Sequence, residues 1–204
     1  MATVAADLGV EEAAVILNGD NGYVTTHAES FKKQYEGQEG SVPVYIWYSS
    51  GVTDFAGVLD QVDTSEADVL FVPSYADEVN LITAEAYSMG LGIPFLGADT
   101  WDSPDLQLDH LNGARFSTHF WPDDPRQVVA DFVTAYSSTH GVEPNSIGAL
   151  GYDAAGLMLQ AISEAGVDDP AAVREELAAV DHSGVTGDLA FNAWGDPLKG
   201  AAVV

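Results

Sequence analysis

The sequence contains no cysteine, which excludes disulfides, thiolate catalysis and zinc sites built on cysteine. Long apolar runs are also absent, and no segment approaches the length that a membrane-spanning helix requires. The first residues, MATVAADLGVEE, have neither the basic segment nor the apolar segment of a signal peptide. The sequence therefore leaves two interpretations open: a cytosolic protein, or a chain without its true start.

Basic residues are scarce, because six Lys and Arg against 32 Asp and Glu give a formal net charge of −26 over 204 residues. No face can gather a basic patch, which argues against nucleic acid and anionic membranes as partners. The acids are spread along the chain, which indicates a solvated acidic surface rather than a cation site. Such a surface suits concentrated salt, where self-repulsion is screened. We therefore expect a halophilic source.

Motifs for nucleotide, metal and nucleophile chemistry are missing as well. There is no GxxxxGK[ST] loop, and the glycines of GLGIPFLG (residues 90–97) run into a predicted strand instead of opening a helix. The histidines show no paired metal-ligand spacing, and no GxSxG marks a nucleophile. Asp20 follows a strand as in a phosphoacceptor domain, but no lysine stands late in the sheet. We therefore predict no cofactor and no metal site.

The first 120 residues predict an α/β fold. Short apolar segments alternate there with segments in which apolar residues recur at helical spacing. Strands that alternate with helices predict a mostly parallel sheet flanked by helices on both faces. The predicted strands are 13–18, 42–48, 68–73, 94–97 and 114–120.

Several helix ends are predicted by residues that favour them. Thr53 is expected to cap the helix after the second strand. The pairs Asp124-Pro125 and Asp169-Pro170 are expected to begin two later helices. Glycines are expected to end three helices, at Gly90, Gly141 and Gly166.

The second part of the chain, residues 121–196, is predicted to be mainly helical. Three helices carry apolar stripes, and the segment GVTGDLAFNAWGD (residues 184–196) is predicted to be a strand with turns. Apolar helix faces need a surface to cover, and residues 121–183 lack strands of their own, so we expect this part to be incomplete. Residues 197–204 are a candidate returning strand.

A candidate recognition site follows the strands of the first part. Tyr23, Ser74 with Tyr75, and Asp99 with Trp101 each come after a different predicted strand. Open α/β sheets bind ligands at the carboxyl ends of their strands. A carboxylate there can hold an ammonium group, and aromatic rings can wall an apolar side chain and attract the cation. Packing of the three aromatic residues in the core is the open alternative for each of them.

At this point the motifs resemble a known family: the extracytoplasmic solute-binding proteins of ABC transporters, in the branched-chain amino acid class. The resemblance covers nearly the whole chain. Four segments carry it: the stretch VLFVPSYADEVNLITAEAYSMGLGIPFLGADTWDSPDL, the helix TDFAGVLDQV, the run ALGYDAAGLMLQAI and the closing GVTGDLAFNAWGDPLKGAAVV. Each is weak alone, and together they are specific.

The resemblance implies a type I periplasmic-binding fold, with two lobes that close on a ligand without catalysis. Residues 1–120 would be the ligand-binding second lobe, and residues 121–196 a helical remnant of the first lobe. By motif position Asp99 would hold the ligand's ammonium group, where the best-known amino acid binders carry Glu, and Tyr23 and Tyr75 would line the pocket. An ABC permease would be the partner, and the full-length protein would be extracytoplasmic.

The main departure from the family is at the start, because Met1 opens just before the first strand of the second lobe. We therefore expect a truncated member or a fragment. Two other functions stay open: a small cytosolic α/β enzyme with Asp99 as general base, or a sensor module that reuses the fold. The enzyme would need a titratable partner beside Asp99.

Overall fold

The computed structural model describes residues 1–204, and they form two compact units. Unit 1 comprises Met1–Ser117 together with Val203–Val204, and unit 2 comprises Thr118–Ala202. None of the helices has both the length and the apolar character needed to cross a bilayer.

Unit 1 is built on a six-stranded sheet in the order β2-β1-β3-β4-β5-β9. The pairs from β2 to β5 are all parallel. At the far edge, Phe116 and Val204 exchange two backbone hydrogen bonds of 2.9 and 3.0 Å, as in an antiparallel pair. The strands are β1 (Glu12–Asn18), β2 (Ser41–Tyr48), β3 (Val69–Val72), β4 (Phe95–Gly97), β5 (Arg115–Thr118) and β9 (Ala202–Val203). The five strands predicted from the sequence are thus present, and the α/β prediction is confirmed.

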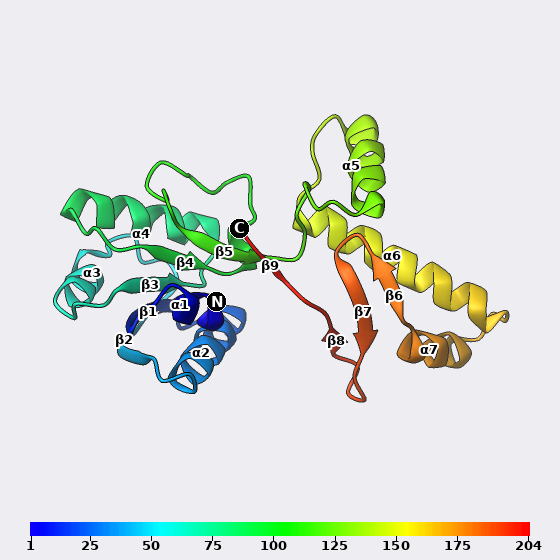
Figure 1. Cartoon of the computed structure of the whole chain (residues 1–204), viewed down its shortest axis with the longest axis horizontal. Coiled ribbons are helices and arrows are strands. Elements are labelled where there is room, and N and C mark those ends of the chain that lie inside the picture. Colours follow the sequence, from blue (N-terminus) through cyan, green and yellow to red (C-terminus); the bar gives the residue numbers. More distant parts are fainter. The chain divides into compact units, whose positions relative to one another are not determined.

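Helices cover both faces of this sheet (Figure 1). Helices α1 (Ala2–Asp7) and α2 (Gly22–Glu36) lie on one face, and α3 (Ala56–Asp63) and α4 (Ala76–Met89) lie on the other. Successive side chains of a strand point to opposite faces. Ile16 accordingly packs in the cluster that includes α3 and α4, whereas its neighbours in β1 pack against α1 and α2. Burial on both faces explains why the strands read as continuous apolar runs.

Two of the predicted helix starts are wrong. Helix α3 begins at Ala56 with Phe55 at the cap position, and Thr53 caps nothing; the neighbouring Asp54 instead accepts a hydrogen bond from Ala56 N, at 3.1 Å. Asp124 begins no helix, because its carboxylate accepts hydrogen bonds from the backbone and side chain of Arg126 at 2.9 and 3.0 Å. Helix α5 (Gln127–His140) therefore starts one residue after that arginine.

The other predicted helix ends are confirmed. Asp169 caps α7 (Pro170–Ala179) by accepting a hydrogen bond from Ala171 N, at 3.1 Å. The three glycines predicted to end helices have φ angles of 75°, 72° and 63°, in the left-handed region where glycine carries no penalty. They end α4, α5 and α6 (Ser146–Ala165), at Gly90, Gly141 and Gly166.

Unit 2 packs α5, α6 and α7 with a small antiparallel sheet in the order β6-β7-β8. Its strands are β6 (His182–Gly184), β7 (Gly187–Phe191) and β8 (Pro197–Leu198). Asp153 of α6 is 4% exposed and accepts hydrogen bonds from Val185 N, Thr186 N and Thr186 Oγ1, at 2.9, 2.8 and 2.5 Å. The buried Asp153 carboxylate thus holds the turn between β6 and β7. Lys199 Nζ also donates a hydrogen bond to the Thr186 hydroxyl, at 2.6 Å.

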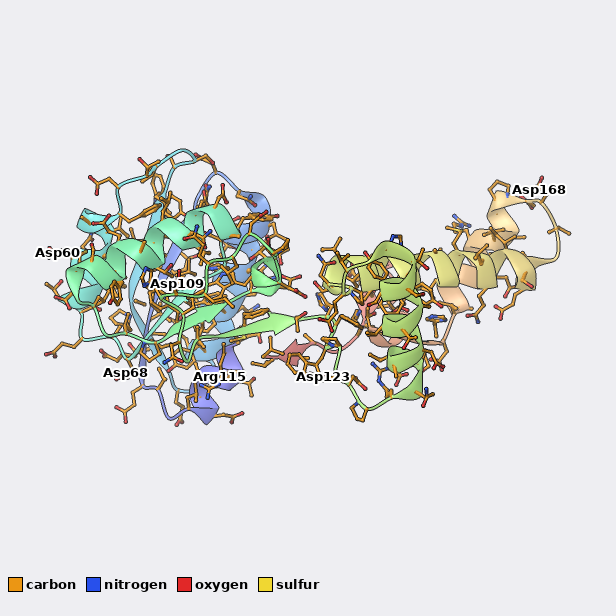
Figure 2. The ribbon with its side chains drawn as sticks, turned by 90° about the horizontal axis from the view of Figure 1, so that it is seen from above. Asp60, Asp68, Asp109, Arg115, Asp123 and Asp168 are labelled. Carbon is orange, nitrogen blue, oxygen red and sulfur yellow. The ribbon has the colours of Figure 1, made fainter.

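Acidic side chains are distributed over the surface of both units. Asp60, Asp68 and Asp109 come from three different segments of unit 1, and Asp123 and Asp168 from unit 2; all five are exposed (Figure 2). Lys32–Glu36 and Arg126–Asp124 are ion pairs between residues that are close in the sequence. Because acids outnumber bases 32 to 6, most carboxylates have no basic side chain with which to pair.

Candidate functional site

The carboxyl ends of β1, β2, β3 and β4 lie side by side, because the four strands are parallel neighbours in the sheet. Polar and aromatic side chains gather at or just after these ends. They are Asn18 at the end of β1, Tyr48 at the end of β2, Ser74 and Tyr75 after β3, and Asp99 after β4. This edge of the sheet is the place where open α/β folds bind ligands.

Tyr23 and Asp99 are joined directly. Asn21 caps α2 by accepting hydrogen bonds from Tyr23 N and Val24 N, at 3.0 and 3.2 Å, which fixes the first turn that carries Tyr23. The Tyr23 hydroxyl then donates a hydrogen bond to Asp99 Oδ1. Burial, and next the hydrogen bond to Asp99, raise the pKa of Tyr23 far above its ordinary value, so the phenol stays a donor.

Tyr75 belongs to the same group of side chains. Its ring centroid lies 6.1 Å from that of Tyr23, and the side chain is 45% exposed. The structure thus brings together Tyr23, Tyr75 and Asp99, three of the five predicted site residues. A half-exposed ring beside a carboxylate provides both an apolar wall and a favourable surface for a cation.

The remaining two predicted residues, Ser74 and Trp101, are buried. Trp101 is 1% exposed, packs in the core and donates from Nε1 to Val72 O at 3.0 Å. Its ring fills the space beside Gly97, where an added Cβ would lie 2.2 Å from Trp101 Cδ2. The expectation that Trp101 closes a pocket is therefore wrong, since the indole supports the loop from within. Ser74 is fully buried, with its hydroxyl 2.8 Å from Tyr48 OH, so its side chain does not face solvent either.

Sequence reasoning missed a polar network and a histidine at this edge. Glu78 of α4 accepts hydrogen bonds from Asn18 Nδ2 at 2.6 Å and from Tyr48 OH at 3.0 Å. His27 stacks on Tyr23 with ring centroids 4.0 Å apart, and its Nδ1 lies 3.0 Å from Tyr23 O. Asn18 and Tyr48 are the last residues of predicted strands, and this position could have indicated that they belong to the site.

The charge of the site is negative. The basic residues of unit 1 are Lys32 and Lys33, in the C-terminal part of α2, and Arg115 at the start of β5. The nine residues from Tyr23 to Lys32 correspond to about 14 Å along the helix axis. No three His, Asp or Glu side chains converge as a metal site would require. His110 is not beside Asp99: it lines a cavity with Pro94 and other residues before β4, at the amino ends of the strands.

The fold defines the class of protein. The chain belongs to the periplasmic binding protein family, whose family model matches residues 1–201. The family resemblance drawn from the motifs is confirmed. A comparison with curated proteins found no significant match.

Solved structures of ABC-transporter binding proteins have the same fold. A leucine binding protein from Thermotoga maritima is 28% identical with a TM-score of 0.90, over 100% of this chain and 59% of that one. A branched-chain amino acid binding protein from Streptococcus pneumoniae, in complex with isoleucine, is 24% identical with a TM-score of 0.85, over 98% and 58%. A solute binding protein from R. palustris, in complex with benzoate, is 17% identical with a TM-score of 0.83, over 99% and 57%. The chain therefore spans less than two thirds of the length of these proteins.

Proposed function

We propose that this chain carries the ligand-binding face of a solute receptor for an ABC importer, and that its ligand is an amino acid or a similar small amine. The ligand is bound and released without catalysis. An ABC permease receives it, and the receptor acts outside the cytoplasm, as the family name of the chain's relatives suggests.

One observation carries the proposal: Tyr23, Tyr75 and Asp99 meet at the carboxyl edge of the sheet, with Tyr23 bonded to the carboxylate. A carboxylate that accepts one hydrogen bond from a phenol has further lone pairs and can also accept a charge-assisted hydrogen bond from an ammonium group. The two tyrosine rings add apolar contact for the rest of the ligand.

The charge of the site favours amines among the ligands that the relatives bind. The Thermotoga maritima relative is a leucine binding protein, the Streptococcus pneumoniae structure contains isoleucine, and the R. palustris structure contains benzoate. Benzoate offers only a carboxylate, which Asp99 would repel. This face therefore suits the ammonium end of an amino acid.

The test separates the two ends of the ligand. Leucine, isoamylamine and 4-methylpentanoate share one branched tail and differ in whether they carry an amine, a carboxylate or both. Each is titrated into the chain in concentrated KCl, and NMR follows the side chains of Tyr23 and Tyr75, because chemical shifts report even weak binding. Leucine and isoamylamine should shift these resonances, and 4-methylpentanoate should not. Shifts with none of the three, or with the acid alone, would refute the proposal.

A further inference from the structure

Glu78 connects three elements at the ligand-binding edge. It is the third residue of α4, and its carboxylate accepts one hydrogen bond from the end of β1 (Asn18 Nδ2, 2.6 Å) and one from the end of β2 (Tyr48 OH, 3.0 Å). Both donors are nearly buried, with Asn18 4% and Tyr48 5% exposed. A carboxylate at this position of a helix often accepts from the backbone of the cap residue instead. Here it binds two side chains from the sheet, so it fixes the first turn of α4 against the strands.

In the chain of hydrogen bonds from Ser74 through Tyr48 to Glu78, donor and acceptor are determined at each step. Tyr48 has a single hydroxyl proton, and the carboxylate of Glu78 can only accept, so that proton goes to Glu78. The Ser74 hydroxyl, 2.8 Å away, therefore donates to the Tyr48 oxygen. Burial is the largest cause that raises the pKa of Tyr48, which keeps the phenol protonated and the direction fixed.

The network ends at the residues of the ligand site. Ser74 directly precedes Tyr75, which occupies the cap position of α4 with extended backbone angles (φ −80°, ψ 163°). The backbone carbonyl of Ser74 also accepts a hydrogen bond from Thr100 Oγ1 at 2.8 Å, and Thr100 follows Asp99. One buried serine is thus tied to Glu78 through Tyr48 on one side and to the loop of Asp99 on the other.

We propose that Glu78 is a positioning residue for the ligand site: through Tyr48 and Ser74 it sets the place of the Tyr75 ring and steadies the loop that carries Asp99. The inference rests on the proposed function for its effect on ligand affinity. Glu78 needs no contact with the ligand for this role, because it acts through the start of α4.

Asp77 provides a matched control for the experiment. It precedes Glu78 in the same turn, is exposed, and loses the same charge when changed to the amide. Glu78→Gln removes one acceptor of the network and places an amide donor near the donors of Asn18 and Tyr48, whereas Asp77→Asn changes only the local field. Tyr48→Phe breaks the same connection while keeping the ring that packs edge-on against Phe55 at 4.9 Å.

Two measurements decide the outcome. In the absence of ligand, the ring resonances of Tyr75 should shift in Glu78→Gln and in Tyr48→Phe, and stay in place in Asp77→Asn. Affinity for leucine or isoamylamine should fall on the order of tenfold in the first two variants at a temperature where all are folded. The double variant should lose little more than either single one, since both changes break one connection.

Several results would overturn the proposal. Equal effects of Glu78→Gln and Asp77→Asn would mean that only charge matters, and additive losses in the double variant would mean that no network exists. If the unchanged chain binds neither probe, the proposed function fails, and the ligand-free Tyr75 resonances still decide whether Glu78 positions this ring. If Glu78→Gln does not fold, Tyr48→Phe with the Asp77→Asn control gives the same two measurements.

Discussion

The hydroxyl of Tyr23 donates a hydrogen bond to Asp99, 76 positions further along the chain. The first residue stands in the opening turn of α2, and the second follows β4. Their meeting at one edge of the sheet turns a carboxylate into an oriented acceptor that can hold a cationic group.

Changing the partners of this hydrogen bond should weaken amine binding to different degrees. Asp99→Asn removes the charge, so affinity for leucine and isoamylamine should fall by about 1.5–3 kcal/mol, the range for hydrogen bonds to charged groups. Tyr23→Phe keeps the charge and loses only the orienting donor, so the loss should be smaller, about 0.5–1.5 kcal/mol. NMR titration measures both. Tyr87→Phe, at a 69% exposed ring stacked on His110, is the control and should bind normally. Undiminished binding in Asp99→Asn would contradict the assignment.

Gly97→Ala should destabilise unit 1. An added Cβ would lie 2.2 and 2.5 Å from Trp101 Cδ2 and Cε2, and the buried indole has no free space to move into. Overpacking of this kind costs about 1–3 kcal/mol, which urea unfolding would detect. Gly57→Ala is the control, because nothing lies within 4 Å of its added Cβ inside α3, and it should stabilise by about 0.4–1 kcal/mol. Equal stability of the two variants would mean that Trp101 is not packed as described.

Asp153→Ala should destabilise unit 2. The change leaves three donors at Val185 and Thr186 without their acceptor in a buried turn. Loss of a buried carboxylate that satisfies several donors should cost about 2–4 kcal/mol, measured by chemical unfolding with Trp fluorescence. Glu175→Ala, at an exposed position of α7, is the control and should change stability little. A small effect at Asp153 would show that water replaces the carboxylate.

Asp68 should make unit 1 sensitive to acid. Its Oδ2 accepts hydrogen bonds from Glu12 N and Glu11 N, both at 3.0 Å, and these bonds lower its pKa. A lowered folded-state pKa contributes stability that is present above the unfolded value of about 3.9 and is lost as pH falls through the folded value. Unfolding free energy should therefore drop less steeply below about pH 4 in Asp68→Asn than in the unchanged chain. An equal drop in Asp68→Asn and in the unchanged chain would contradict this assignment.

The acidic surface should make the fold depend on salt, as we propose for a halophilic protein. Self-repulsion of a net charge of −26 is screened as the Debye length shortens from about 10 Å at 0.1 M to about 3 Å at 1 M salt. The thermal midpoint should rise by several degrees over this range of KCl. Sucrose is the comparison, since it stabilises proteins without screening charge. Equal stability at low and multimolar KCl would refute the proposal.

Local patterns in the sequence determined much of this fold. Apolar runs predicted the strands β1 to β5, and glycines at the ends of helical spacing predicted where α4, α5 and α6 end. These features depend on a few neighbouring residues, so they can be read without knowing the rest of the molecule. Thr53 failed as a cap because the helix starts three residues later, where Asp54 and not Thr53 accepts the hydrogen bond from Ala56 N.

The sequence also placed Tyr23, Tyr75 and Asp99 after separate strands, which was enough to name them as candidates together. Only the tertiary structure decided which of them meet, because direct contact depends on which strands are neighbours and on how each loop turns. It joined Tyr23 to Asp99, turned Trp101 into the core beside Gly97, and placed Glu78 between Asn18 and Tyr48. Those contacts span long stretches of chain, and no local pattern of residues encodes them.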